Sequence, residues 1–294
     1  MTLSTCKKTI LKGGTIVLPD RLVGASLVIE NGIIKGITNA KIGGDYEIVD
    51  VTGKVLMPGV IDSHVHMWDP SPLNYREDWY HGSQAAAAGG ITTIVEMPLS
   101  VPPVTDRHGF ELKKEVASKD SFVDFALWGG LIPSCIDKLA NPDYPQITDG
   151  YLVKGMREVA KFDGLIGVHA ENAEVADFGS KHMSDINCKD ESMHDEARPW
   201  WAELEAIQRA VLFSKVNNSR LLICHMTIAE GAEYLKKAKM EGVKVSVETC
   251  PHYLLFDKNI LRDKKSYAKC NPPLRSRENV EKLWDYIFDG TIDI

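Results

Sequence analysis

From Gly59 onward, short apolar runs alternate with stretches of helical period, and this alternation limits what the chain can fold into. We expect strands at six apolar runs, residues 60–66, 92–97, 123–128, 165–169, 221–225 and 243–247. Helices are expected between them, among others at residues 78–88, 199–215 and 229–241. Strands that alternate with helices form a parallel sheet with crossover connections. Because the pattern repeats without an early reversal, it favours a (β/α)8 barrel of the TIM type over a doubly wound sheet.

The first 58 residues have a different texture. Two β-rich runs, 15–18 and 26–29, occur among glycine-containing breaks at Gly13-Gly14, Asn31-Gly32 and Gly43-Gly44. Asn31-Gly32 between two apolar runs predicts a β-hairpin. We therefore expect a small antiparallel β unit at 1–58, followed by the barrel at 59–294.

Composition narrows the classes of partner. The 294 residues are 44% hydrophobic and 26% charged, which is ordinary for a soluble globular protein. A formal net charge of -7 gives no general attraction to nucleic acid or to an anionic membrane, so a small-molecule partner is expected. No apolar stretch resembles a membrane span or a secretion signal, and we expect a cytoplasmic protein.

Six cysteines lie far apart, without a Cys-x-x-Cys pair that would suggest a disulfide framework or a zinc ribbon. We expect them to be reduced and mostly buried: Cys6, Cys135, Cys188, Cys224, Cys250 and Cys270.

Four histidines fall where strands of the expected barrel end. His64 and His66 stand two apart, so both imidazoles point to the same side of a strand, while His169 and His225 each end an apolar run. The carboxyl ends of barrel strands converge on one mouth, so these four side chains should meet. Neutral imidazole suits zinc and similar divalent ions, and the pattern predicts a metal site. The remaining histidines are expected to be surface or structural residues: His81, His108, His182, His194 and His252.

With these histidines in place, the sequence resembles the cyclic amidohydrolases, the family that contains allantoinase, dihydropyrimidinase and dihydroorotase. Five segments carry the resemblance: residues 57–66, 85–93, 168–172, 223–226 and 248–253. The first reads MPGVIDSHVH, and the third contains HAEN at 169–172. Three further segments look most like allantoinase: 96–99, 127–131 and 269–275. Dihydroorotase fits less well, because its substrate carboxylate calls for an arginine shortly after the His-x-His pair and none stands there.

The resemblance implies a (β/α)8 barrel beside a small β-sandwich, and two divalent ions, taken as zinc. His64 and His66 would hold one ion, and His169 and His225 the other. Asn271 matches a region that contacts the substrate ring. The implied reaction is hydrolysis of a cyclic amide, allantoin to allantoate, in a cytoplasmic homo-oligomer, a homotetramer by resemblance.

Two departures from the family pattern accompany these matches. The sequence between about residues 131 and 150 has no match to the family's fourth barrel strand or to its metal-bridging lysine. Lys138, Lys154 and Lys161 do not stand on apolar strands that could replace it. In the family, an aspartate binds metal and takes the proton from the attacking water. Its position lies beyond the matched segment, so no catalytic residue is assigned. Three alternatives therefore stay open: a hydantoinase or dihydropyrimidinase, a non-catalytic scaffold, and an inactive fragment of this family.

Overall fold

The computed structural model describes residues 7–41, 43–132, 147–188 and 190–294. Contacts divide the chain into unit 1, which is Met1–Met97 with Lys113–Trp128, and unit 2, which is Pro98–Leu112 with Gly129–Ile294. The boundary that we place at residue 58 stays a prediction.

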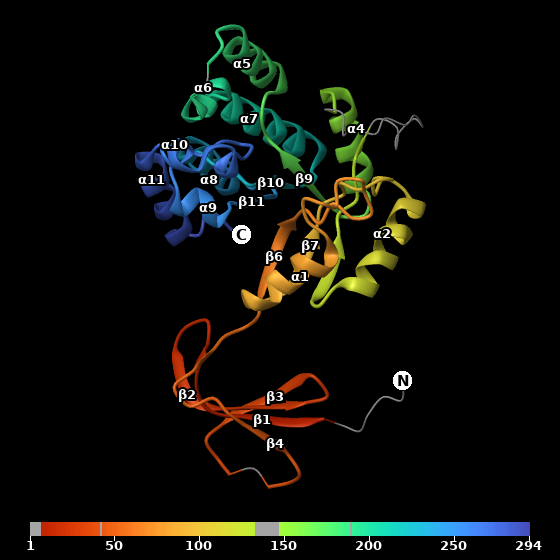
Figure 1. Ribbon diagram of the computed structural model, residues 1–294, viewed down its shortest axis with the longest axis vertical. Coiled ribbons are helices and arrows are strands. Elements are labelled where there is room, and N and C mark those ends of the chain that lie inside the picture. Colours follow the sequence, from red (N-terminus) through yellow and green to blue (C-terminus); the bar gives the residue numbers. More distant parts are fainter. Residues whose placement is uncertain (1–6, 42, 133–146, 189) are drawn as a thin grey trace. The chain divides into compact units, whose positions relative to one another are not determined.

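Unit 1 begins with a sheet in the order β3-β2-β1-β4, with β5 beside β1. Figure 1 labels β1 to β4 of this sheet. Its strands are β1 (Lys8–Val17), β2 (Leu22–Glu30), β3 (Ile33–Thr38), β4 (Glu47–Asp50) and β5 (Val55–Leu56). The predicted hairpin between β2 and β3 is confirmed, and Asn31 and Gly32 have φ values of 54° and 76°, as a type I′ turn requires.

This first sheet differs from the expectation in three respects. The glycine pair at 13–14 does not break the strand, because β1 runs through it with a register shift between Leu11 and Gly14. The sheet is mixed rather than antiparallel, since β4 and β5 pair in parallel with β1. It forms a single layer in the described residues, so the β-sandwich is not confirmed. Several large apolar side chains of this layer are exposed, including Ile33, Ile34, Ile48 and Val55.

Unit 1 continues with three parallel strands in the order β6 (Val60–Val65), β7 (Ile91–Glu96) and β8 (Asp124–Leu127). Helix α1 (Trp79–Ala88) begins where the Asp78 side chain accepts a hydrogen bond from the His81 backbone, and α2 (Arg107–Asp120) contributes Ala117 to the core. Trp79 and Ile94 are fully buried there, and the Trp79 ring packs 5.3 Å from that of Phe125. This apolar packing holds the helix against the strands.

Unit 2 contains a second parallel sheet, in the order β11 (Val245–Val247), β10 (Arg220–Cys224) and β9 (Leu165–His169). The central strand β10 is buried along Leu221–Ile223, as expected of a strand covered on both faces. Its longer helices are α4 (Asp149–Ala160), α5 (Ala173–Asp185), α7 (Trp200–Asn217), α8 (Ala229–Met240) and α11 (Arg277–Phe288). Its short helices are η1 (Glu191–Met193), α6 (His194–Ala197), α9 (Pro251–Leu255), α10 (Ile260–Lys264) and η2 (Lys265–Ala268).

The α/β alternation is confirmed, and all six predicted strands are present with ends within two residues of the expected ones. Closure into a barrel is not observed, because the described residues form two three-stranded parallel sheets that belong to different units. Between β8 and β9 the described part of the chain contains α4 and no strand. Lys138 and most of the expected gap lie outside the described residues. None of the helices in the described ranges is long and apolar enough to traverse a bilayer.

Candidate metal centre

His169 and His225 meet at the carboxyl ends of two neighbouring strands. His169 is the last residue of β9 and pairs in register with Cys224, the last residue of β10, so that His225 follows immediately. The Nδ1 atom of His169 lies 3.2 Å from the Nε2 atom of His225, and the two rings stand 4.7 Å apart at 70°. The structure therefore brings this predicted pair together.

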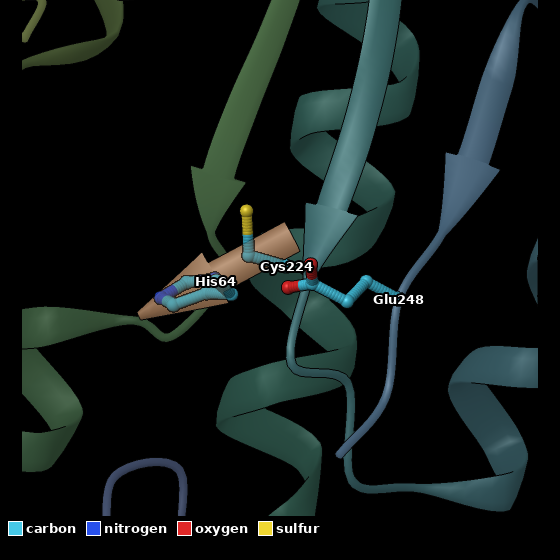
Figure 2. Close-up of side chains that lie close together, drawn as sticks. All are labelled: His64, Cys224 and Glu248. Carbon is cyan, nitrogen blue, oxygen red and sulfur yellow. The ribbon is translucent and has the colours of Figure 1, made fainter. Parts of the chain in front are cut away.

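The backbone turns sharply at His225. Its φ of 38° lies in the left-handed region, which side chains rarely adopt. The buried Glu248, directly after β11, supports this turn: its carboxylate accepts from the His225 amide at 3.0 Å and its carbonyl from the Met226 amide at 2.8 Å. Figure 2 shows Glu248 with its carboxylate beside Cys224 at the end of β10. Glu248, which follows the neighbouring strand β11, thus holds His225 in its left-handed conformation.

Cys224 behaves as a structural thiol. Burial and, second, the charge of Glu248 raise the pKa of Cys224, so it stays protonated and unreactive. The expectation of mostly buried cysteines is wrong for the others that are described, since Cys188, Cys250 and Cys270 are only partly buried. These four described cysteines form no disulfide with one another, whereas Cys6 and Cys135 lie outside the described residues.

His64 and His66 form the second predicted pair, which belongs to unit 1. His64 lies near the end of β6 (Figure 2), and its ring stands 5.3 Å from that of His66. The Nδ1 atom of His66 is buried and has no hydrogen-bond partner among the described residues. Burial, and then the charges of His64 and Lys113, lower the pKa of His66 to about 4. Its imidazole is therefore neutral at physiological pH, the form that binds metal.

A buried ion pair supports the segment that follows His66. The side chains of Glu96, at the end of β7, and Lys113, on α2, are fully buried and lie 2.8 Å apart. Glu96 also accepts a hydrogen bond of 3.0 Å from the Met67 amide, and Lys113 donates one of 2.7 Å to the Met97 carbonyl. Burial raises the pKa of Glu96 to about 7, against the opposing effect of Lys113.

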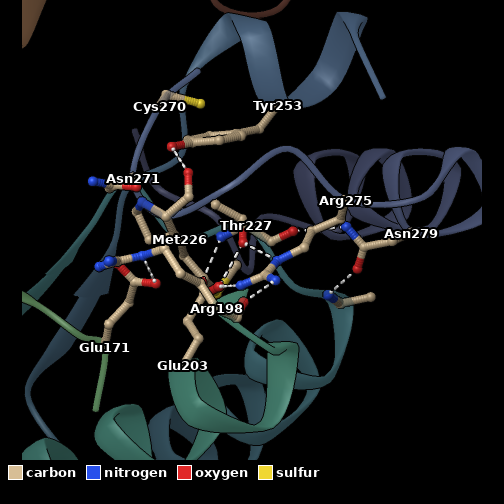
Figure 3. Close-up of polar contacts among 12 residues, drawn as sticks. Glu171, Arg198, Glu203, Met226, Thr227, Tyr253, Cys270, Asn271, Arg275 and Asn279 are labelled. Atoms are coloured by element: carbon tan, nitrogen blue, oxygen red, sulfur yellow. Dashed lines mark hydrogen bonds and ion pairs between the residues drawn. The ribbon is translucent and has the colours of Figure 1, made fainter. Parts of the chain in front are cut away.

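Glu171 connects His169 to Arg198. Figure 3 shows Glu171 beside Arg198. Its carboxylate lies 2.8 Å from the Nε2 atom of His169 and accepts a hydrogen bond of 2.6 Å from the Nη2 atom of Arg198. Burial alone would raise the pKa of Glu171, but the hydrogen bonds from His169 and Arg198 outweigh it and lower the pKa to about 2. Glu171 is therefore a buried anion behind the histidine pair.

Asn271 lies beside His194 rather than in isolation. The Nε2 atom of His194 stands 2.9 Å from the Asn271 side-chain oxygen and 3.1 Å from the Cys270 carbonyl. The prediction of His194 as a surface residue is wrong, because it is partly buried against this loop, and burial lowers its pKa. Surface positions are confirmed for His81, His108 and His182, while His252 is half-buried on α9.

Sequence reasoning missed the carboxylates that surround these histidines. For Glu171 one signal existed, because it stands two residues after His169 in the segment HAEN. For Glu248 a signal also existed, because it opens the segment 248–253 that carries the family resemblance. The sequence offers no comparable signal for Arg198, the partner of Glu171, which lies 27 residues away along the chain.

Comparisons with known proteins agree with the family resemblance. No family model matches the chain. The allantoinase of Rubrobacter xylanophilus is 36% identical over 303 residues, which cover 96% of this chain and 66% of that protein. The allantoinase of Escherichia coli is 33% identical over 310 residues, covering 97% of this chain and 67% of the relative. The chain thus spans about two thirds of the length of these curated relatives.

Solved structures point to the same group of enzymes. The L-hydantoinase (dihydropyrimidinase) from Arthrobacter aurescens matches with a TM-score of 0.92 and 32% identity over 98% of this chain and 68% of that one. The dihydropyrimidinase from Brevibacillus agri matches with a TM-score of 0.88 and 26% identity, over 97% of this chain and 67% of the other. On this sequence and structural similarity, the chain belongs to the cyclic amidohydrolases, the family of metal-dependent hydrolases that includes allantoinase and hydantoinase.

Proposed function

We propose that this chain carries the histidine ligands of a metal-dependent hydrolase that opens allantoin to allantoate. The observation that carries the proposal is the 3.2 Å approach of His169 Nδ1 to His225 Nε2. Two nitrogens bound tetrahedrally to one zinc ion at 2.0–2.1 Å would stand about 3.3 Å apart, so the pair fits a shared cation.

The second pair also fits a cation. His66 has a buried Nδ1 atom with no hydrogen-bond partner among the described residues, and its lowered pKa keeps the ring neutral. Neutral imidazoles are ligands for zinc and related divalent ions, and His64 would be the other donor of this half-site. When bound, such ions supply Lewis acidity, which lowers the pKa of water and polarises a carbonyl group.

Three of this chain's own groups would then prepare the reaction. Glu171 holds a proton on the Nε2 atom of His169, and Glu248 holds the backbone of His225. His194 fixes the Asn271 side-chain oxygen through its Nε2 atom, which leaves the amide nitrogen to contact a ring carbonyl of the substrate.

Allantoin is the first candidate substrate because the relatives named above are allantoinases. A hydantoin or dihydropyrimidine ring is the second, favoured by the structural match to the Arthrobacter hydantoinase. Both candidates are cyclic amides. Incubating zinc-loaded protein with allantoin, hydantoin and dihydrouracil, and following ring opening, separates them: ring opening of hydantoin but not allantoin would contradict the first choice.

A scaffold or an inactive fragment is the non-enzymatic alternative, and the two described lysines between β8 and β9 favour it. Lys154 lies within α4 and Lys161 follows this helix, where it pairs with Glu158, so neither stands on a strand as a metal-bridging lysine would. Because an anionic bridge neutralises charge between two cations, its loss should weaken the second ion. Zinc content of the purified chain tests this: about two ions per chain favours the enzyme, and none favours the alternative.

The histidine assignment is tested separately. Replacing His169 and His225 by alanine should abolish zinc binding at their half-site, and replacing His64 and His66 should abolish it at the other. Replacing the exposed His108 and His182 is the matched control and should leave zinc binding unchanged. A cytoplasmic location and a homotetrameric assembly complete the proposal, and sedimentation of the purified protein tests the assembly.

A further inference from the structure

The ring of His169 is engaged at both nitrogens. Its Nε2 atom lies 2.8 Å from the Glu171 carboxylate, and its Nδ1 atom lies 3.2 Å from His225 Nε2. An ionised carboxylate can only accept a hydrogen bond. The proton must therefore sit on Nε2, and the lone pair of Nδ1 is directed toward His225.

Glu171 is itself held in place by Arg198. The Nε atom of Arg198 donates to both carboxylate oxygens, at 2.9 and 3.2 Å, and its Nη2 atom donates to one of them at 2.6 Å. The Glu171 side chain is 3% exposed and that of Arg198 17%. Charge-assisted bonds of this forked kind fix the orientation of the carboxylate as well as its position.

Arg198 is anchored in turn through its backbone. Its carbonyl accepts a 2.7 Å hydrogen bond from Arg275, whose guanidinium also contacts Glu203 and the Thr227 hydroxyl (Figure 3). Thr227 stands two residues after His225. One buried polar network thus supports the segments of both histidines.

We propose that Glu171, held by Arg198, is a positioning residue that fixes His169 as its Nε2–H tautomer and so presents Nδ1 as the metal-binding atom. The inference rests on the proposed metal site and adds which atom of His169 binds and what selects it. Hydrogen-bond partners of metal-binding histidines commonly act in this way, and their loss lowers metal affinity about 10- to 100-fold.

The test compares two variants that differ in whether an acceptor remains. Glu171→Gln keeps an amide oxygen that can accept from Nε2–H and should retain the tautomer. Replacing Glu171 and Arg198 together by methionine removes the acceptor without leaving a buried unpaired charge, which guards against misfolding. Glu174→Gln is the matched control, because Glu174 is exposed in the first turn of α5.

Two measurements are made on each protein. Long-range ¹H–¹⁵N NMR of metal-free, histidine-labelled protein at mildly alkaline pH reports the tautomer of His169, assigned with a His169→Ala sample. Competition with a chelator reports zinc affinity. We expect a single Nε2–H tautomer in the wild type, Glu171→Gln and the control. In the double variant we expect a mixture of tautomers and a 10- to 100-fold loss of affinity.

An unchanged tautomer and unchanged affinity in the folded double variant would overturn the inference. If the wild type binds no zinc, the proposed function fails, and the NMR result alone decides whether Glu171 selects the tautomer. The two failures are therefore distinguishable.

Discussion

The carboxylate of Glu203 and the guanidinium of Arg275 lie 2.8 Å apart with side chains only 1% and 6% exposed. Thr227 completes the cluster, since its amide donates to Glu203 at 2.7 Å and its hydroxyl accepts from Arg275 at 3.0 Å. Burial raises the pKa of Glu203, opposed chiefly by the charge of Arg275. The pair therefore ties the loop after Asn271 to the segment after His225.

Replacing Arg275 by methionine should destabilise the protein strongly. It leaves Glu203 as a buried group without its charge partner, which typically costs about 3–5 kcal/mol. Replacing both Arg275 and Glu203 by methionine should recover most of this loss, because no buried charge remains. Urea unfolding of the two variants and the wild type measures the difference. Equal stability of the single and double variants would show that the charge is not the cause.

The pair of Glu96 and Lys113 predicts a similar loss in unit 1. Lys113→Met removes the cation that opposes the raised pKa of Glu96, so unfolding free energy should fall by about 3–5 kcal/mol. The loss should grow as the pH rises through about 7, because Glu96 of the wild type ionises there and Lys113 stabilises its anion. The control is Lys119→Met, an exposed position near the end of the same helix. Thermal unfolding of the wild type and both variants across a pH series measures the loss of stability. A pH-independent loss in Lys113→Met would contradict the interpretation.

The pKa of Glu171 is shifted in the opposite direction to that of Glu96, and it predicts a pH dependence at acidic pH. Its pKa in the fold is about 2, below the ordinary value of 4.5, so its contribution to stability is fully present above 4.5 and is lost as the pH falls toward 2. A pKa shift of this size corresponds to a contribution of about 3 kcal/mol to the free energy of unfolding. Glu171→Gln removes the titrating group, so the difference in unfolding free energy between wild type and variant should shrink over this range. A constant difference would refute the assignment.

Many of the strands and turns could be predicted because the sequence patterns that indicate them lie within the elements themselves. Apolar runs predicted the six strands after residue 59 within two residues, and Asn31-Gly32 predicted the turn between β2 and β3. The runs at 15–18 and 26–29 marked only parts of β1 and β2, which span Lys8–Val17 and Leu22–Glu30. The bulge at Gly13 was not predictable, because a glycine pair indicates a strand end as readily as a bulge within one. Parallel pairing of β4 with β1 depends on contacts across more than thirty residues, which no local pattern records.

The candidate site was predictable only in its histidines. His169 and His225 end apolar runs, and parallel strands bring such ends together. Their supports were not predictable, because a charged side chain carries no local sign of its partner: Arg275 pairs with Glu203 at a separation of 72 residues. His194 was misjudged for the same reason, since its contact with Asn271 spans 77 residues.

A close approach of two helices gives the last prediction. A Cβ atom at Gly179 of α5 would lie 2.1 Å from the carbonyl oxygen of Ala197, the last residue of α6. The residue after Ala197 is Arg198, which holds Glu171. Gly179→Ala must therefore push backbone against backbone next to this ion pair.

We expect Gly179→Ala to destabilise the protein by about 1–3 kcal/mol, as overpacking does, and to weaken zinc binding in proportion to the displacement of Arg198. Gly150→Ala is the matched control, because Gly150 also lies in a helix, α4, but has nothing within 4 Å of its added Cβ atom. That variant should be neutral or stabilised by up to about 1 kcal/mol, since alanine favours the helix. Denaturant unfolding and zinc competition on both variants measure the contrast. If Gly179→Ala matched Gly150→Ala in stability and in zinc affinity, the approach of α5 to Ala197 would not be what positions Arg198.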